Sequence, residues 1–320
     1  MPGKRLLTNE AASYRRNGLL LTISNTRYNG NMSSSSRPFI AEAAPFLKWA
    51  GGKSRLLSQY QSFLPSRGAI RRYFEPFIGS AALYFHLQPV AAVLSDCNWK
   101  LVETYRVVRD HPEELIAALQ PHKNEKAYYY KVRAQDPNDL SPIQRAARLI
   151  YMNKTCYNGL YRENQKGEFN VPFGRYRRPK ICDRARLYAA SQALQGVDLC
   201  DVDFAVAVKD AGPGDFVYFD PPYVPLNATS SFTSYSRYGF DDEDHRRLAQ
   251  AVRDLTARGC QVMLSNSSAP LVYDLYQGCG YHIEEVQARR NINSKGHKRG
   301  PVTELLIMNY DVRQRDAAQR

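Results

Sequence analysis

The chain has 320 residues, of which 44 are Lys or Arg and 31 are Asp or Glu, giving a net charge of +13 and a pI near 9.4. This charge favours a polyanionic partner. It is concentrated in residues 157–187, with eight basic residues against three acidic ones, and in residues 286–300, with five against none. A single basic run is often a solvated face. Two such runs in a chain with 22 tyrosines, whose rings can stack on bases, favour nucleic acid.

The cysteines and the apolar runs exclude several classes of protein. The six cysteines include no Cys-x-x-Cys pair and no spacing that joins histidines in a zinc site, so we expect reduced cysteines and no metal. No apolar stretch reaches the roughly 20 residues that span a bilayer. The apolar run at residues 18–23 is too short for the core of a signal peptide. We therefore expect a cytoplasmic protein without a membrane partner.

Residues 1–44 differ in composition from the rest of the chain. They are polar, basic and rich in Ser, Asn and Gly, which is typical of a disordered extension. Met32, within this segment, is a candidate for the natural start of the protein. The pattern becomes globular from Pro45 onward.

Strand-like runs then alternate with helical periodicity. The strand-like runs lie at residues 73–75, 91–95, 216–219, 261–265, 281–286 and 303–310. The clearest helix has Leu248, Val252 and Leu255 on one face and stops at Gly259. This alternation predicts an α/β fold with a Rossmann-like, largely parallel, doubly wound sheet. The last two runs are joined by a basic loop without a helix, which predicts an antiparallel hairpin at the C-terminal edge of the sheet.

Between residues 99 and 186 the strand signals fade, and helical and loop segments carry most of the tyrosines and basic residues. We interpret residues 99–186 as an inserted, mostly helical subdomain. Residues 45–98 and 187–312 then form the sheet domain, and residues 313–320 form a tail.

An acidic segment follows the apolar run at 216–219 directly and consists of Asp220, Pro221, Pro222 and Tyr223. Ligands bind at this end of a strand in an open α/β sheet. A carboxylate and a backbone carbonyl held by proline can each accept one N–H of a nucleobase amine, which aims the nitrogen lone pair at an electrophile. A tyrosine can stack on an extruded base. A plain acidic turn would have the same residues, so this motif alone leaves both interpretations open.

Two further segments could hold a cofactor. Residues 46–53 combine aromatic side chains, a Gly-Gly turn and two lysines, although an ordinary surface turn is an alternative and the spacing of a phosphate loop is absent. A strand at 73–75 leads into a turn with Gly79, and Asp96 ends the next run, where an acid can bind ribose hydroxyls. Asp96 could equally be a turn residue. The full Gly-x-Gly-x-x-Gly motif is absent, so we do not expect a dinucleotide.

Residues 157–176 are dense in side chains that read DNA. Arginine pairs with guanine, asparagine pairs with adenine, and leucine or proline can contact the methyl group of thymine. A polar β-hairpin loop has the same Asn-Gly signals, and spacing alone does not separate the two interpretations.

Taken in order, these motifs resemble those of the Dam-like DNA adenine-N6 methyltransferases, which use S-adenosylmethionine. The matching segments are Lys-Trp-Ala-Gly-Gly-Lys at 48–53, Glu-Pro-Phe-x-Gly at 75–79, Asn-Gly-Leu-x-Arg-x-Asn through Asn-Val-Pro-Phe-Gly at 158–174, and Asp-Pro-Pro-Tyr at 220–223. The similarity covers residues 45–310, with later pieces at Phe232, Tyr235, Phe240, 264–266 and 290–306. Four motifs in the family's order are far more specific than any one of them.

The resemblance implies a class I methyltransferase sheet in residues 45–98 and 187–312 and a DNA target-recognition subdomain in residues 99–186. It implies transfer of a methyl group from S-adenosylmethionine to N6 of a flipped adenine in double-stranded DNA, within GATC. The transfer would be direct, without a metal or a covalent enzyme intermediate. We expect the enzyme to act as a monomer.

The resemblance also assigns roles to residues. Asp220 and the carbonyl of Pro221, next to Pro222, would hold the target amine, and Tyr223 would stack on the flipped adenine. Asp96 would bind the ribose of the cofactor, and the cofactor pocket would be lined by Trp49, Ala50, Lys53, Phe77, Asp96, Asp203, Phe204 and Asp220. Tyr157 would fill the gap left by the extruded base. The residues expected to read or flank the target sequence are Lys48, Asn158, Leu160, Arg162, Pro172 and Arg175.

One position departs from the family pattern, because Ala81 stands where many relatives have Gly and its methyl group would face the cofactor. A DNA-binding protein that keeps the fold without the activity is therefore one rival hypothesis. Methylation of cytosine at N4 is another, since the same amine chemistry applies. Asp220, where a serine would suit cytosine, favours adenine.

Overall fold

The computed structural model describes residues 13–16, 19–22, 37–226, 239–289 and 301–311. It separates into two units, Met1–Arg37 and Pro38–Arg320. In the first unit, β1 (Ser13–Arg16) pairs antiparallel with β2 (Leu19–Thr22). The rest of the predicted extension up to residue 36 lies outside the described residues, as do Phe232, Tyr235 and residues 290–300 of the family pattern. The disordered extension therefore stays a prediction.

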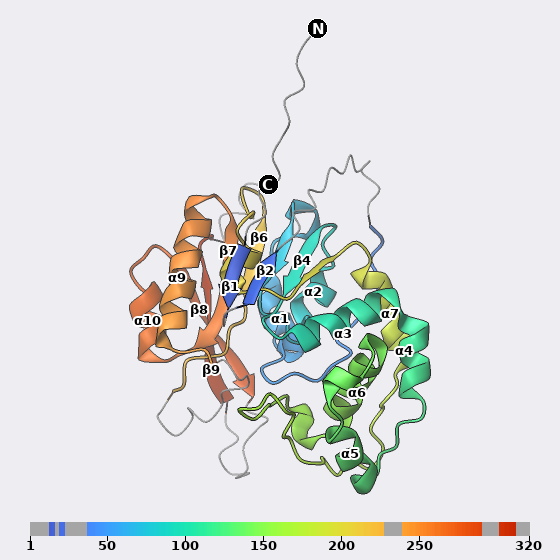
Figure 1. The fold of residues 1–320 in the computed structure, drawn as a ribbon. Helices are drawn as coiled ribbons and strands as arrows, with labels where there is room; N and C mark the ends of the chain where they lie inside the picture. Colours follow the sequence, from blue (N-terminus) through green and yellow to red (C-terminus); the bar gives the residue numbers. More distant parts are fainter. Residues whose placement is uncertain (1–12, 17–18, 23–36, 227–238, 290–300, 312–320) are drawn as a thin grey trace. The chain divides into compact units, whose positions relative to one another are not determined.

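The second unit is built on a seven-stranded sheet whose strand order is β5-β4-β3-β6-β7-β9-β8 (Figure 1). The pairs among β3, β4, β5, β6 and β7 are parallel, and β9 pairs antiparallel with both β7 and β8. The strands are β3 (Tyr73–Glu75), β4 (Ala92–Ser95), β5 (Asp198–Cys200), β6 (Phe216–Phe219), β7 (Gln261–Ser267), β8 (His282–Arg289) and β9 (Pro301–Met308). The predicted mostly parallel α/β sheet is confirmed.

The two strands at the end of the chain form the antiparallel pair that the sequence predicts, with one detail that it does not give. The last strand, β9, lies inside the sheet between β7 and β8, and β8 is the edge strand. Strand β5 is missing from the predicted set. It has only three residues and a single buried one, Leu199, so it has no apolar run that would mark it.

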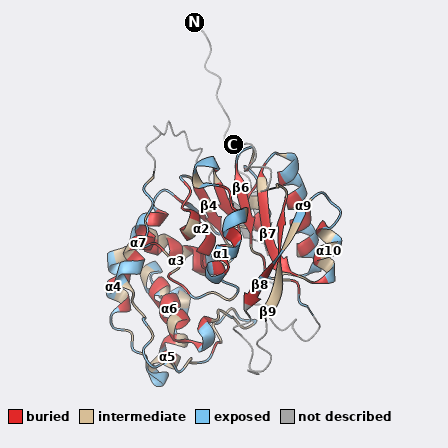
Figure 2. Cartoon of the chain, turned by 180° about the vertical axis from the view of Figure 1, so that it is seen from behind, coloured by how far each residue is buried: buried red, intermediate tan, exposed pale blue. Residues whose placement is uncertain are grey.

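Helices cover both faces of the sheet, and alternation along the strands divides the core into two clusters. On one face Phe74, Val217 and Leu264 pack with α8, α9 and α10. On the other face Tyr73 and Tyr218 pack with α1 to α4, α6 and α7 (Figure 2). The helices are α1 (Leu57–Tyr60), α2 (Ala82–Leu87), α3 (Trp99–Asp110), α4 (Pro112–Leu119), α5 (Lys126–Arg133), α6 (Pro142–Thr155), α7 (Arg184–Leu194), α8 (Phe204–Ala207), α9 (Asp242–Ala257) and α10 (Pro270–Tyr276).

Residues 99–186 contain helices α3 to α6 and no named strand among them, in line with the mostly helical character predicted for this segment. These helices lie on the side of the molecule away from α9 and α10 (Figure 1). Helices α3, α4 and α6 share one buried cluster with the sheet, whereas α5 belongs to a smaller cluster with residues 156–173. The base of this segment is therefore continuous with the sheet core, and its outer part has a core of its own.

The chain order reverses at the centre of the sheet, because β4 and β5 continue from β3 in one direction while β6 and β7 continue in the other. Ligands of open α/β sheets bind at the carboxyl ends of the strands beside such a reversal. The segments that follow β3 and β6 carry Phe77 and Asp220, so both meet at this point. None of the described helices is both long and apolar enough to cross a membrane.

Candidate active site and DNA-reading hairpin

Asp220 is the first residue beyond β6, whose four residues are all buried. Its Oδ1 atom lies 2.7 Å from Nζ of Lys53 and accepts a hydrogen bond of 2.8 Å from Oγ of Ser265. The described residues form no hydrogen bond to Oδ2 of Asp220, whose side chain is 20% exposed. The two neighbours therefore fix the carboxylate through one oxygen and leave the other for a ligand.

The ammonium of Lys53 has two further neighbours besides Asp220. Its ammonium also donates to the carbonyl oxygen of Gly51 at 2.7 Å and lies 4.9 Å from the ring centroid of Tyr223. Only 3% of its side chain is exposed. The sequence predicts Lys53 as a cofactor residue, and in the structure its ammonium contacts the catalytic candidate Asp220.

Tyr223 is fixed at its far end, because its hydroxyl donates to Oε2 of Glu304 on β9 at 2.7 Å. Burial raises the pKa of the half-buried Glu304 and raises that of Tyr223 well above its usual value. The next residue, Val224, donates its N–H to Asn266 and accepts a hydrogen bond from Ser267, both on β7. The segment that carries Asp220 and Tyr223 is therefore tied to β7 and β9 and keeps one conformation. Within it, Pro221 is buried and Pro222 is exposed.

Buried hydroxyl and carboxyl groups lie behind Asp220. The hydroxyl of Tyr218 lies 3.1 Å from Oγ of Ser265. On the adjacent strand, Tyr73 donates to Oε2 of Glu75 at 2.9 Å, and burial raises the pKa of Glu75 to about 8. Glu75 is therefore mostly protonated at neutral pH, which avoids a second negative charge close to Asp220.

The predicted cofactor residues come from the ends of the four strands β3 to β6 and from residues 49–53. Phe77 after β3 stacks on Phe204 with centroids 5.6 Å apart, and Phe240 lies edge-on to Phe77 at the same distance. Trp49 and Ala50 are half-buried. A Cβ atom on Gly79, which has φ +43°, would lie 2.8 Å from Cδ1 of Trp49, so only glycine permits this packing.

The two predicted acids of the cofactor pocket differ in their partners. Asp96 follows β4, accepts the N–H of Asn98 at 2.9 Å, and has its pKa raised to about 6 by burial. Asp203 caps α8 by accepting the N–H of Ala205 and lies 3.1 Å from a guanidinium nitrogen of Arg247. Asp203 is therefore engaged by Ala205 and Arg247, whereas Asp96 is engaged by its neighbours Gly79, Cys97 and Asn98.

The DNA-reading candidates lie on an irregular hairpin that follows α6. Its two arms pair through the bridges Cys156↔Phe173 and Glu163↔Phe169, and Asn170 donates its N–H to the carbonyl of Arg162 at 3.0 Å. Of the predicted residues, Asn158, Arg162 and Pro172 are exposed, and Leu160 is half-buried against the cluster that includes residues of α5 and α6.

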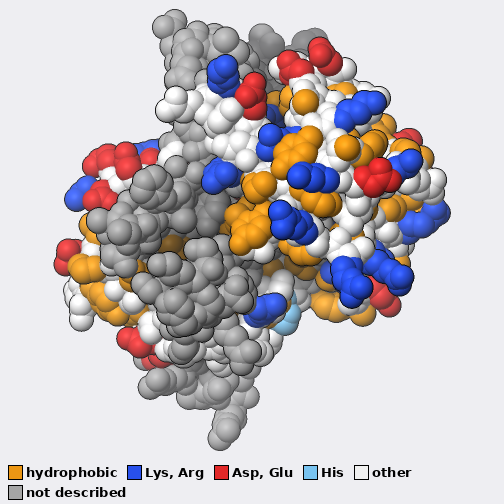
Figure 3. Space-filling model, turned by 90° about the horizontal axis from the view of Figure 1, so that it is seen from below, with side chains coloured by type: hydrophobic (Ala, Val, Ile, Leu, Met, Phe, Trp, Pro, Cys, Tyr) orange, Lys and Arg blue, Asp and Glu red, His pale blue; other side chains and the backbone are white. Residues whose placement is uncertain are grey.

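Tyr157 is 45% exposed at the base of this hairpin, and Arg175 is exposed with a left-handed φ of +55°. Lys48 joins them, because Asn153 of α6 bonds its backbone N–H and carbonyl, at 2.8 and 2.6 Å, and its ammonium lies 4.0 Å from the ring centroid of Tyr176. Lys and Arg side chains alternate with hydrophobic ones on the side of the lower face that holds this segment (Figure 3). The structure thus brings the predicted DNA residues together.

The family of D12 class N6 adenine-specific DNA methyltransferases matches residues 49–292. The chain belongs to this family.

Several relatives support the assignment over nearly their whole length. The type II methyltransferase M.MjaIII of Methanocaldococcus jannaschii is 46% identical over 290 residues, which cover 84% of this chain and all of the relative. The type II methyltransferase M1.LlaDCHI of Lactococcus lactis subsp. cremoris is 44% identical over 274 residues, covering 83% and 95%. The DNA adenine methylase of Escherichia coli strain K12 is 35% identical over 267 residues, covering 82% and 94%.

Several residues that the structure brings to the site of this DNA adenine methyltransferase had no role assigned from the sequence. Ser265 and Glu304 lie on β7 and β9, far along the chain from Asp220, and Glu75 precedes the recognised Pro-Phe pair. Tyr161 lies between two predicted DNA residues. Ser265 and Glu304 do lie in segments that match the family pattern, which was the available signal, but only the fold shows their contacts.

Proposed function

We propose that this methyltransferase transfers the methyl group of S-adenosylmethionine to N6 of an adenine that is flipped out of duplex DNA, within the sequence GATC. Methylation of adenine in DNA follows from the family. The proposal adds the identity of the cofactor, the flipping of the target base and the target sequence GATC. The observation that carries it is the carboxylate of Asp220, bonded through Oδ1 to Lys53 and Ser265, with Oδ2 left for the target amine.

The residues predicted for the cofactor pocket fit S-adenosylmethionine. The rings of Phe77 and Phe204 suit an adenine ring, and the carboxylate of Asp96 suits two ribose hydroxyls. When bound, S-adenosylmethionine supplies an electrophilic methyl group on sulfur. Trp49, packed on Gly79, would close the pocket on the side of the Gly-Gly turn.

The chain's own residues would then act on the amine. Oδ2 of Asp220 and the carbonyl of Pro221 each accept one N–H, which turns the nitrogen lone pair toward the methyl group. The nitrogen would take the methyl group that S-adenosylmethionine supplies as the bond from that carbon to sulfur breaks, and the amine would then lose one proton to solvent. Tyr223, held by Glu304, offers its ring to the flipped base, and Tyr157 occupies the space that the base leaves.

Sequence reading would belong to the outward side of the hairpin. Arg162 is suited to guanine, and Leu160 and Pro172 are suited to the methyl group of thymine. Lys48, Asn158 and Arg175 would complete the contacts at the base of the hairpin. The exposure of all of these side chains except the half-buried Leu160 supports this proposal. Action as a monomer stays a prediction.

Base flipping and sequence choice can be tested together in vitro. A duplex carrying 2-aminopurine at the target adenine of GATC is expected to gain fluorescence when the protein binds, because the analogue leaves the stack. Duplexes in which one base pair of GATC is replaced are expected to be methylated more slowly. If the protein methylates the unmodified GATC duplex normally but causes no fluorescence change in the 2-aminopurine duplex, flipping is contradicted. Equal methylation rates on all unmodified and substituted duplexes would contradict GATC as the target.

A further inference from the structure

Three consecutive residues of the hairpin face two different parts of the molecule. The guanidinium of Arg162 is exposed and donates to Oδ1 of Asn170 on the opposite arm at 2.7 Å. The two neighbours of Arg162 in sequence have partners outside the hairpin, since Tyr161 contacts Trp49 of the sheet domain and Glu163 contacts Lys100 of α3. The residue proposed to read DNA is therefore flanked by residues that contact Trp49 and the first turn of α3.

Tyr161 contacts the segment predicted to hold the cofactor. Its ring stacks on Trp49 with centroids 5.5 Å apart and an interplanar angle of 22°. Its hydroxyl donates to Oε1 of Glu163 and also bonds the side chain of Asn98, two residues after Asp96. Burial raises the pKa of Tyr161 well above its usual value, so the ring stays neutral. One tyrosine thus contacts Trp49 and the residue two positions after Asp96.

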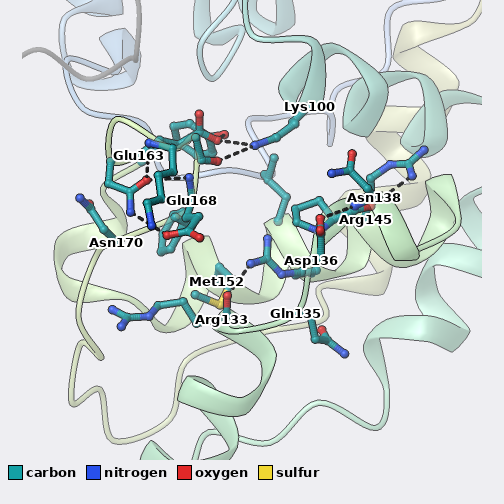
Figure 4. A pocket seen from close by; sticks show the side chains of 18 of the residues that line it. Lys100, Arg133, Gln135, Asp136, Asn138, Arg145, Met152, Glu163, Glu168 and Asn170 are labelled. Carbon is teal, nitrogen blue, oxygen red and sulfur yellow. Dashed lines mark hydrogen bonds and ion pairs between the residues drawn. The ribbon is translucent and has the colours of Figure 1, made fainter.

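Lys100 makes the second connection. It lies in the first turn of α3, just after Asp96, and its ammonium lies 2.6 Å from Oε1 of Glu163 and 3.1 Å from the carbonyl oxygen of Gly167. The side chains of Lys100 and Glu163 are 20% and 14% exposed. An ion pair at this depth is screened less than one on the surface. Figure 4 shows Lys100 reaching from its helix to the hairpin.

The outer half of the hairpin, residues 163–168, has few other supports. A cavity of about 780 Å³ lies beside it, lined by the first turn of α3 together with residues of α5 and α6 (Figure 4). Within the described chain, every polar contact to residues 163–168 from outside the hairpin comes from Lys100. Lys100 therefore sets the position of the outer half of the hairpin, and α3 sets the position of Lys100.

We propose that Lys100, Glu163 and Tyr161 are positioning residues that couple cofactor binding to DNA reading. The inference rests on the proposed function, in which Trp49 and Asp96 bind the cofactor and Arg162 reads a base. A cofactor that fixes Trp49 and the Asp96 segment also fixes Tyr161 and Lys100, and through them Arg162. Because coupling is reciprocal, DNA that orders the hairpin strengthens cofactor binding by the same factor.

The test measures this coupling as a ratio of equilibrium constants, without any methyl transfer. The probe is S-adenosylhomocysteine, which carries no transferable methyl group. The affinity for a GATC duplex is measured by fluorescence anisotropy with and without saturating S-adenosylhomocysteine. We expect the wild type to bind the duplex about 5 to 150 times more tightly with the probe. Lys100→Met and Tyr161→Leu are expected to bring the ratio close to one while each still binds S-adenosylhomocysteine alone.

A matched control comes from the same helix. Glu103 of α3 forms a similar ion pair with Arg145, at 2.7 Å and with 18% and 19% of the side chains exposed, but does not touch the hairpin. Glu103→Gln is expected to keep the wild-type ratio, whereas Glu163→Gln loses it. The double variant Lys100→Met with Glu163→Gln is expected to lower the affinity ratio no further than either single change does.

The outcomes separate the two proposals. A wild-type ratio of one, or a ratio that survives in Lys100→Met, Tyr161→Leu and Glu163→Gln, overturns the coupling and leaves the proposed function intact. A wild type that binds the duplex but not S-adenosylhomocysteine contradicts the proposed function itself. Tyr161→Phe, which keeps the stack on Trp49, should retain more of the ratio than Tyr161→Leu, and equal loss in both would contradict a role for the stack.

Discussion

The edge of the sheet and the hairpin hold their functional residues in opposite ways. At the sheet edge, Asp220 is contacted by the buried groups of Lys53 and Ser265, and Tyr223 is tied to Glu304. On the hairpin, Arg162 is exposed and bonds only to its neighbouring arm among the described residues. The first region is held by several contacts to buried neighbours, and the second depends on contacts from outside it.

This difference has a chemical reason. Methyl transfer needs the amine and the methyl group aligned closely, so misplacement of Asp220 would reduce the rate steeply. Sequence reading needs side chains that enter a groove of the DNA, and these must be exposed. Substitutions at the sheet edge should therefore change the methylation rate on every DNA. Substitutions on the hairpin should change which DNA sequence is methylated.

The largest effect is expected for Asp220→Asn. The amide keeps the size of the carboxylate but loses its charge and one acceptor, so kcat should fall at least about 100-fold with little change in duplex binding. Rapid-quench measurement of methyl transfer and anisotropy binding check this. Asp201→Asn, at a partly exposed acid paired with Arg106, is the control and should keep the wild-type rate. Comparable rates in both variants would contradict the role of Asp220.

The next effect is expected for Ser265→Ala, which removes the hydroxyl donor to Oδ1 of Asp220. A hydrogen bond to a charged group contributes about 1.5–3 kcal/mol, so we expect a fall of about 10-fold or more in kcat and an unchanged KM for DNA. Ser191→Ala removes another buried hydroxyl, bonded to the carbonyl of Arg109, and controls for loss of stability. A Ser265→Ala change that raised only KM would argue against a positioning role.

On the hairpin, Arg162→Ala should change sequence choice more than rate. A bidentate contact to guanine supplies about 1–3 kcal/mol, so discrimination at one base pair should relax by about 5- to 150-fold. Competition between GATC and singly substituted duplexes measures it. Lys131→Ala removes an exposed cation of α5 and should leave the preference unchanged. A uniform loss of rate on all duplexes would place Arg162 with the sheet-edge residues instead.

A pH effect separates the two regions further, because Glu75 has its pKa raised to about 8 by burial. A carboxyl with a raised folded pKa binds its proton in the folded state at pH values where the unfolded chain has lost it. The contribution of Glu75 to the free energy of unfolding is therefore fully present below pH 4.5, and it is lost as the pH rises toward 8. Urea unfolding of Glu75→Gln should show a weaker decrease between pH 5 and 8 than the wild type. Parallel curves would contradict this assignment.

The smallest effect concerns Ala81, which is fully buried at the start of α2 with a left-handed φ of +52°. An L-residue with a side chain is strained in this region, which explains why glycine suits the position. Ala81→Gly should stabilise the fold by about 1 kcal/mol. Ala82→Gly, in right-handed helix next to it, should destabilise by about 0.5–1 kcal/mol. Urea unfolding compares the two, and stabilisation by both would rule out the φ of Ala81 as the cause.

The sequence predicts the sheet well because its central strands are short, largely apolar and buried on both faces. The run at 216–219 and the segment after it required no tertiary information. Strand β5 could not be predicted, since only Leu199 is buried there. The position of β9 inside the sheet could not be predicted either, because strand order is set by packing between distant segments.

The predicted site residues share the same limits. Asp220 and the outward hairpin residues follow from local motifs, but the contacts that fix them come from strands and helices distant in sequence. Ser265 is 45 residues from Asp220, and Lys100 is 63 residues from Glu163. The motif also places Lys53 in the cofactor pocket, and only the structure shows its ammonium on Asp220. Long-range pairs of this kind need the fold before they can be recognised.

The most direct test of the central claim is expression of the chain in a host that lacks adenine methylation, followed by single-molecule sequencing of the host DNA. The account predicts N6-methyladenine at GATC with the intact protein and none with the Asp220→Ala variant. Modification at another sequence would contradict the assignment of the hairpin residues. No modification by the soluble intact protein would contradict the proposed activity.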